Sequence, residues 1–460
     1  MRPPSPPRVR ALSIHAGYRC RHTGACCTSG WAIPVEPETE ERLRTALHTG
    51  TLRPGDRDCF RRVPGLPHGA RVVLRTDEAG RCVLLDPRRA RPGLCAVHHE
   101  LGEEALPSAC RHFPRVVTLT PLGVSVTLSH YCPTAAAMLF SPVTPGAPGR
   151  EPVTPRDSDW TGPEGSAGIA DPSSLDPDVL LGMTRDPALR IVENPEAFPP
   201  EWPYEGLDAR DALPPLLRPG VLMDWPSLER WERFAVSVLG NEGRGPEAAL
   251  DALAAAAEEA RRWTPADGAF DAFLKGVLEG AATRGNEGEG TAFQGAGGRR
   301  VFEGALRNGF RSPRDSAGRE SRGVKGSREW PLVADCVPPG APLPAAPDAL
   351  AEADARWVAP GWPALGRPIR HWLASKAFGS WIALQGEGLR TTVAFLRLAL
   401  GVLRAEAARG SAEAARVLDG DLLREGVRRA DLLLLHLADP EALARRLSRS
   451  EAAEGPDAAW

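Results

Sequence analysis

Cysteine side chains are concentrated near the amino-terminal end of this 460-residue chain. Of its 9 cysteines, only Cys336 lies beyond residue 132, and 8 of the 10 histidines share the same early segment. In a reducing compartment, thiol and imidazole groups at this density favour metal binding or redox chemistry over a disulfide framework. Buried structural thiols, disulfides in an exported protein and chance are the alternatives.

The spacing of these cysteines limits the kinds of centre they could form. Cys26 and Cys27 are adjacent, which makes them poor disulfide partners for each other but leaves them able to bind a metal. No paired CxxC knuckles occur, so a simple zinc ribbon is not indicated. Four thiolates satisfy either tetrahedral zinc or an iron–sulfur cluster. The predicted ligand pool has more members than one closed site needs: Cys20, Cys26, Cys27, Cys82, Cys95, Cys110 and Cys132.

Charge and hydropathy exclude several other classes of protein. The chain has a formal net charge of -3, which argues against a nucleic-acid partner. The first 132 residues contain 19 arginines and 12 acidic side chains, a formal +7, and we expect these arginines to offset thiolate charge. No stretch approaches the ~18 apolar residues of a membrane span, and the amino terminus lacks the apolar core of a secretory signal. We therefore expect a cytoplasmic protein with no membrane association.

Composition and periodicity predict an α+β fold, in which a small irregular metal-binding domain with short hairpins precedes a mainly helical region. Proline, glycine and polar residues separate the parts. The predicted regions are a cysteine-cluster domain at 11–140, a linker at 141–175, a helical region at 176–283, a low-complexity and disordered loop at 284–348 and a carboxy-terminal helical region at 349–450.

Within the cysteine-cluster domain, the pattern predicts one helix and two hairpins. The helix is expected at Glu38–His48. One hairpin would join Arg71–Leu74 to Arg81–Leu85, and the other would join Val116–Leu119 to Val124–Leu128. Hairpins of this size cannot supply a large core, so metal binding would contribute to the folding free energy of the domain.

Helices dominate the rest of the predicted structure. After the turn at Asp224, apolar residues recur at steps of three and four from Trp225 to Val238, and Pro246 opens an alanine-rich helix that reaches Trp263. The run Asp431–Leu437 is too short to span a membrane and is expected in the core, where His436 would be hydrogen-bonded.

Five cysteine-containing segments resemble the bacterial YkgJ-like cysteine-cluster family, which is described as zinc- or iron-chelating. The shared plan is a dense cluster that ends in two adjacent cysteines, then isolated cysteines, then Cys-Arg-x-Phe/Tyr-Pro. The segments are YRCRHTGACC at 18–27, GRCVLL at 80–85, GLCAVHHE at 93–100, ACRHFPR at 109–115 and SHYCPTAAAML at 129–139.

Further residues are similar to the flagellin lysine N-methylase branch of this family. They are the sequence from Gly30 to Ile33, the pair Pro114-Arg115 and the pair Cys132-Pro133, and the likeness covers residues 17–140. The resemblance implies an enzyme that methylates a lysine of a protein substrate with S-adenosylmethionine and holds an iron–sulfur cluster through these cysteines. The sequence itself shows neither a strand-linked GxGxG turn nor the CxxxCxxC spacing of radical cofactor sites.

One departure from the family pattern concerns a ligand. The common form is CxxCGxCC, and Thr23 stands here where its second cysteine would be. His22 is the nearest substitute donor, with an exposed histidine beside a turn as the alternative. Cys59 lies outside the family segments and is expected to be a non-ligand, and Cys336 is expected to be an isolated structural or surface thiol.

Several neighbouring residues have less specific expected roles. Arg111 would support thiolate charge, and Pro114 would set the turn into the second hairpin. His98, His99 and His112 are candidate ligands or proton carriers, with placement at the surface as the default expectation for each.

Three functions are compatible with these residues. The first is the metal-dependent lysine N-methyltransferase that the resemblance implies. The second is a non-enzymatic module that binds zinc or iron, with a structural or sensed metal and a helical surface for a partner. The third is a thiol redox protein. Catalytic residues and oligomeric state are not indicated by the sequence.

Overall fold

A computed structural model describes residues 7–29, 32–52, 58–63, 69–78, 80–85, 95–141, 186–283 and 347–435. The predicted linker and low-complexity loop fall almost wholly outside these residues, as do Cys336 and His436.

A five-stranded mixed sheet takes strands from both sides of the predicted linker. Its order is β7-β1-β6-β5-β8. β5 and β6 form the antiparallel hairpin that the sequence predicts, while β1 pairs parallel to β6 and β8 pairs parallel to β5. The sheet therefore continues across the predicted domain boundary at residue 140. Its strands are β1 (Val9–Leu12), β5 (Arg115–Thr120), β6 (Gly123–Leu128), β7 (Ile191–Glu193) and β8 (Leu207–Asp208).

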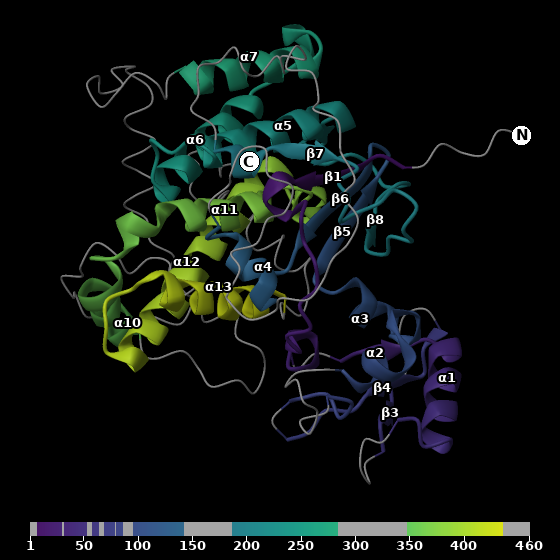
Figure 1. Cartoon of the computed structure of the whole chain (residues 1–460). Helices are drawn as coiled ribbons and strands as arrows, with labels where there is room; N and C mark the ends of the chain where they lie inside the picture. Colours follow the sequence, from purple (N-terminus) through teal and green to yellow (C-terminus); the bar gives the residue numbers. More distant parts are fainter. Residues whose placement is uncertain are drawn as a thin grey trace, which may run out of the picture.

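A second, smaller unit contains most of the cysteines, and we call its described residues from Ala25 to His112 the cysteine lobe. It lies to one side of the sheet, away from the long helices (Figure 1). Its three-stranded sheet has the order β2-β4-β3 and carries five short helices. The elements are η2 (Ala25–Cys27), β2 (Pro34–Val35), α1 (Pro37–His48), β3 (Phe60–Arg62), β4 (Val72–Leu74), α2 (Ala96–Leu101), η4 (Glu103–Ala105) and α3 (Ser108–His112).

The cysteine lobe confirms one local prediction and corrects another. The expected helix is α1, which begins at Pro37 and ends at His48. The first predicted hairpin is wrong as a pair of strands, because β4 pairs with β2 and β3. A single antiparallel bridge between Thr76 and Cys82 connects its two halves. The local turn residues were visible in the sequence, but the partner strands came from distant segments.

Helices that follow the linker build the largest apolar core. Asp224 caps α5, since its Oδ1 accepts a hydrogen bond from the Ser227 backbone N–H at 2.7 Å. Trp231 and Trp372 are almost fully buried between the packed helices. The long helices are α5 (Trp225–Leu239), α6 (Pro246–Ala260), α7 (Phe270–Thr283), α11 (Gly366–Ala377), α12 (Leu389–Ala414) and α13 (Gly420–Leu435).

Shorter elements complete the described fold. They are η1 (Ser13–His15), α4 (Pro133–Met138), η6 (Pro187–Leu189), β9 (Leu216–Arg218), β10 (Val221–Leu222), η7 (Pro265–Asp267), α10 (Pro347–Ala353), the π-helix η8 (Asp354–Val358), η9 (Trp362–Leu365) and η10 (Trp381–Leu384). The α+β composition and the helical carboxy-terminal region are as predicted. None of the described helices combines the length and apolar content that crossing a bilayer requires.

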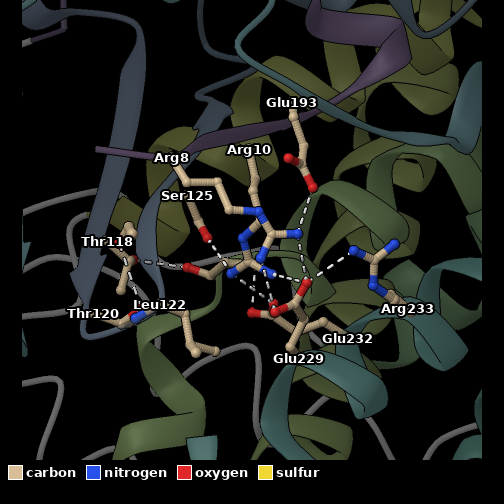
Figure 2. A network of polar contacts seen from close by, with 12 residues as sticks. Arg8, Arg10, Thr118, Thr120, Leu122, Ser125, Glu193, Glu229, Glu232 and Arg233 are labelled. Atoms are coloured by element: carbon tan, nitrogen blue, oxygen red, sulfur yellow. Dashed lines mark hydrogen bonds and ion pairs between the residues drawn. The ribbon is translucent and has the colours of Figure 1, made fainter. Parts of the chain in front are cut away.

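A buried ion network fixes β1 against α5 (Figure 2). Arg10 on β1 is 2% exposed and donates to the Ser125 hydroxyl on β6 at 2.8 Å. The same guanidinium lies 3.2 Å from a carboxylate oxygen of Glu232 and 3.5 Å from one of Glu229. Burial raises the pKa of Glu232, while Arg10 acts in the opposite direction. Because β1 precedes the first cysteines in the chain, this network fixes the position of the strand that leads to them.

Candidate metal centre

The two adjacent cysteines lie on a tight turn of the cysteine lobe. Gly24 adopts φ 73°, a left-handed conformation that glycine reaches without steric cost, and its carbonyl accepts from the Cys27 backbone N–H at 2.9 Å. This turn begins η2 and places the sulfurs of Cys26 and Cys27 3.9 Å apart. The glycine thus permits two neighbouring residues to present thiols toward one region.

Three distant segments bring further cysteines to η2. The Cys82 backbone N–H donates to the carbonyl of Cys27 at 2.7 Å, which ties the turn before Cys82 to η2. Cys95 forms a bridge to Leu85 and stands directly before α2. Cys110 lies within α3.

Four of these thiols interact directly, and we call Cys26, Cys27, Cys82 and Cys95 the thiol group. The Cys27 thiol interacts with the thiols of Cys26, Cys82 and Cys95, and these interactions raise its pKa. The interaction with Cys27 lowers the pKa of Cys26 and of Cys82. The thiols of this group therefore shift one another's pKa values, as closely spaced ionisable groups do.

Cys110 is the nearest further neighbour of the thiol group. Burial of its sulfur raises its pKa well above the usual value, and the charges of Cys26, Cys95 and Cys82 add to the effect. The structure therefore places five of the seven predicted ligands in one neighbourhood of the cysteine lobe.

The other two predicted ligands, Cys20 and Cys132, lie toward the central sheet. Cys132 is buried, and its sulfur is 3.8 Å from the Tyr18 hydroxyl. Cys20 is an exposed residue. Partial desolvation of the Cys20 sulfur raises its pKa, and the nearby thiols of Cys132 and Cys26 contribute to the rise. The ligand pool is thus divided into a group of five and a pair.

Cys59, expected to be a non-ligand, packs into the apolar core of the cysteine lobe. It is 2% exposed, among Leu43, Phe60 and Leu74. Burial raises the pKa of the Cys59 thiol to about 11, and Cys82 contributes. A neutral, buried thiol acts as a small hydrophobic side chain.

The candidate histidines have different environments. His22, the expected substitute donor, is exposed, and its ring meets the ring of His98 with 4.6 Å between centroids. His99 is exposed and lies 3.3 Å from a carboxylate oxygen of Glu100. The default of surface placement is wrong for His112, which is buried. Its ring nitrogens lie 2.9 Å from the Ser108 carbonyl oxygen and 3.0 Å from the Pro203 carbonyl oxygen, so its polar atoms have partners inside the protein.

A cavity of about 360 Å³ separates the cysteine lobe from the central sheet. Cys26, Cys27, Cys95 and Cys110 line it from the lobe, while Cys20 and Cys132 line it from the sheet side. A small molecule in this cavity would therefore lie beside these cysteines. Aromatic and charged side chains complete the wall, among them Tyr18, Arg19, Arg21, His22, His98, Glu103, Arg111, Phe113 and Arg115.

A buried pair of histidines, His15 and His130, was not singled out by the sequence analysis. The Nε2 atoms of His15 and His130 lie 3.2 Å apart, and both residues are fully buried. Neither Nδ1 atom has a hydrogen-bond partner among the described residues. Asp431 accepts from the His130 backbone N–H at 2.7 Å and from the Trp372 indole N–H at 2.9 Å. Only the position of His130 beside Cys132 gave a sequence indication of this pair.

Neither its side-chain geometry nor similarity to known proteins identifies this arrangement. Among the described residues, no group of three or more histidine, cysteine, aspartate or glutamate side chains has the arrangement of a metal site. Comparison with protein-family models, with curated proteins and with solved structures finds no match for this chain.

Proposed function

We propose that the protein binds a thiolate-preferring metal, zinc or iron, through the thiol group, with Cys110 as a further donor. The observation that carries this proposal is that the Cys27 thiol interacts with the thiol of its neighbour Cys26 and with those of Cys82 and Cys95 from two distant segments of the chain. Four sulfur donors close together are the ligand set that tetrahedral zinc and iron–sulfur clusters prefer.

The distance between the sulfurs of Cys26 and Cys27 is compatible with binding of both to one metal ion. Zinc–sulfur bonds of ~2.3 Å in a tetrahedron place two ligand sulfurs about 3.8 Å apart. Cys26 and Cys27 have their sulfurs 3.9 Å apart. Metal binding would replace the shared protons of the thiol group and would close the remaining sulfurs around the ion.

The construction of the cysteine lobe supports a structural contribution from the metal. Its strands β2, β3 and β4 have only 2, 3 and 3 residues. Its apolar core is separate from the larger core of the helices. A small unit with short strands gains folding free energy from a bound metal, because the unfolded chain does not hold a preformed site.

Access to the sulfurs favours an open centre over a sealed one. Three members of the thiol group and Cys110 line the cavity. A metal held there would meet the solvent or a ligand on its cavity side, whereas a purely structural zinc is usually enclosed. The lysine methylation with S-adenosylmethionine implied by the resemblance stays a prediction, as does a non-enzymatic metal module.

The test is metal analysis of the full chain purified without oxygen, combined with an absorption spectrum. We expect a stoichiometric amount of zinc or iron, and visible absorption if the metal forms an iron–sulfur cluster. Cys27→Ser should lose most of the metal. Cys59→Ala is the matched control, because Cys59 is buried in the apolar core, and this variant should retain the metal.

Two outcomes would contradict the proposal. One is a folded, metal-free protein whose described cysteines all react with an alkylating reagent equally with and without a chelator. The other is equal metal content in wild type, Cys27→Ser and Cys59→Ala. Reversible formation of a disulfide in the metal-free protein would favour the thiol redox function instead.

A further inference from the structure

Arg115 is the cation most firmly built into the wall of the cavity. Its guanidinium carbon lies 4.2 Å from the centre of the Trp202 ring, with Tyr18 and Phe198 rings at 5.8 and 5.9 Å. One terminal nitrogen donates to the Arg111 carbonyl at 3.4 Å. These contacts hold the planar group in one orientation.

The charge of Arg115 lacks a paired carboxylate among the described residues. Within the described ranges, its buried Nε atom has no hydrogen-bond partner and no carboxylate lies within ion-pair distance of its guanidinium. Desolvation lowers the pKa of Arg115, although Tyr18, Glu103 and Cys20 partly oppose the effect. A partly desolvated guanidinium without an anion is costly, so the site gains stability from any anion that enters it.

The rest of the cavity wall carries the same sign of charge. Arg19, Arg21 and Arg111 line it together with Arg115, while Glu103 is the one carboxylate of the wall among the described residues. The buried Nε atom of Arg111 also lacks a hydrogen-bond partner within the described part of the chain, although a terminal nitrogen of this arginine lies 3.6 Å from a carboxylate oxygen of Glu104. Arg19 is exposed and pairs with Glu196 at 3.3 Å, and Arg111 pairs with Glu104, so Arg115 is more available to an anion than either of them.

We infer that this cavity is a binding site for a small organic or inorganic anion, and that Arg115 binds its carboxylate or phosphate group. A guanidinium offers two parallel N–H donors to such a group, and a cavity of about 360 Å³ accommodates a small metabolite. The thiols that share the wall would lie beside the bound anion. The inference depends on the arginines and the cavity, and it stands whether or not the thiol group holds a metal.

The experiment measures binding of two probes, inorganic phosphate and succinate, to the full chain by isothermal titration calorimetry at constant ionic strength. The protein is used as purified, and its metal content is measured separately. Failure of the metal proposal therefore does not affect the interpretation of the anion titrations. We expect one probe or both to bind with a stoichiometry of about one anion per chain. Binding of phosphate alone or of succinate alone would identify the preferred group.

Variants distinguish a built site from general attraction to a basic surface. Arg115→Lys keeps the positive charge but removes the two parallel N–H donors, and it should weaken anion binding about tenfold or more. Arg115→Gln should abolish measurable binding. Arg262→Gln is the matched control, because Arg262 is exposed and pairs with Glu259 away from the cavity, and it should bind like wild type.

Three results would overturn the inference. The first is that neither probe binds to the folded wild-type protein. The second is that Arg115→Lys and Arg115→Gln both bind as wild type does. The third is that Arg262→Gln weakens binding to the same extent as Arg115→Gln, because general attraction to a basic surface would then explain the binding. If Arg115→Gln does not fold, Arg115→Lys still decides the outcome.

Discussion

Acid should destabilise this protein through its buried histidine pair, and replacing His130 with glutamine should remove part of that sensitivity. His15 and His130 are fully buried with their Nε2 atoms 3.2 Å apart. Burial lowers the pKa of His130 to about 3, although Asp431 opposes the shift. Burial and the charge of His130 also lower the pKa of His15 well below its usual value.

The sign and size of the effect follow from these shifts. The unfolded chain binds protons at a pKa of about 6.5, while the folded pair stays neutral, so stability is complete above that pH and falls as the pH drops below it. At pH 5 each neutral histidine costs about 2 kcal/mol of stability, because the gap of ~1.5 pH units corresponds to about 1.4 kcal/mol per unit. For His130 the loss continues until the pH reaches the folded-state pKa of about 3.

The assay is urea unfolding at pH 7 and pH 5, followed by tryptophan fluorescence. The drop in unfolding free energy between the two pH values should be smaller in His130→Gln than in wild type by about 2 kcal/mol. His99→Gln is the control, because His99 is exposed, and its pH dependence should match wild type. Identical pH dependences in wild type and His130→Gln would show that the pair does not titrate as argued.

Two further predictions concern the scaffold. Glu232→Leu leaves the buried Arg10 without its nearest carboxylate and should cost about 3 kcal/mol of unfolding free energy, measured with urea; an unchanged midpoint would contradict the role of the network. Gly388→Ala should also destabilise the protein, because φ at this position is +56° and a Cβ would lie 2.0 Å from the Leu216 carbonyl oxygen. Gly276→Ala, by contrast, places its Cβ in open space within α7 and should stabilise the protein by up to about 1 kcal/mol. Thermal unfolding in which both glycine variants shift the midpoint in the same direction would refute this contrast.

Local features of the sequence predicted the elements whose contacts are local. The cap at Asp224 and the apolar spacing after it predicted α5, and the turn before Gly123 predicted the β5–β6 hairpin. The pairing of β1 with β6 joins residues such as Val9 and Val124 that are far apart in the chain. No local pattern encodes such a pairing, and for the same reason the sheet's extension across residue 140 was not foreseen.

The candidate site was predictable in composition but not in arrangement. Cysteine density indicated the ligand pool, but spacing alone did not separate Cys20 and Cys132 from the thiol group. In the structure the Cys132 sulfur contacts the Tyr18 hydroxyl, on the side of the central sheet. The role of Arg115 also required the fold, because Trp202, against which it stacks, comes from beyond the predicted linker.

The most direct test of the central claim is X-ray absorption spectroscopy of the metal in the full chain, purified without oxygen. The account predicts a shell of sulfur neighbours at ~2.3 Å, as thiolate ligation of zinc gives, with fewer sulfurs in Cys27→Ser. A shell of nitrogen and oxygen neighbours alone would show that the metal is bound elsewhere. Together with unchanged spectra in Cys27→Ser, that result would contradict a metal centre built from Cys26, Cys27, Cys82 and Cys95.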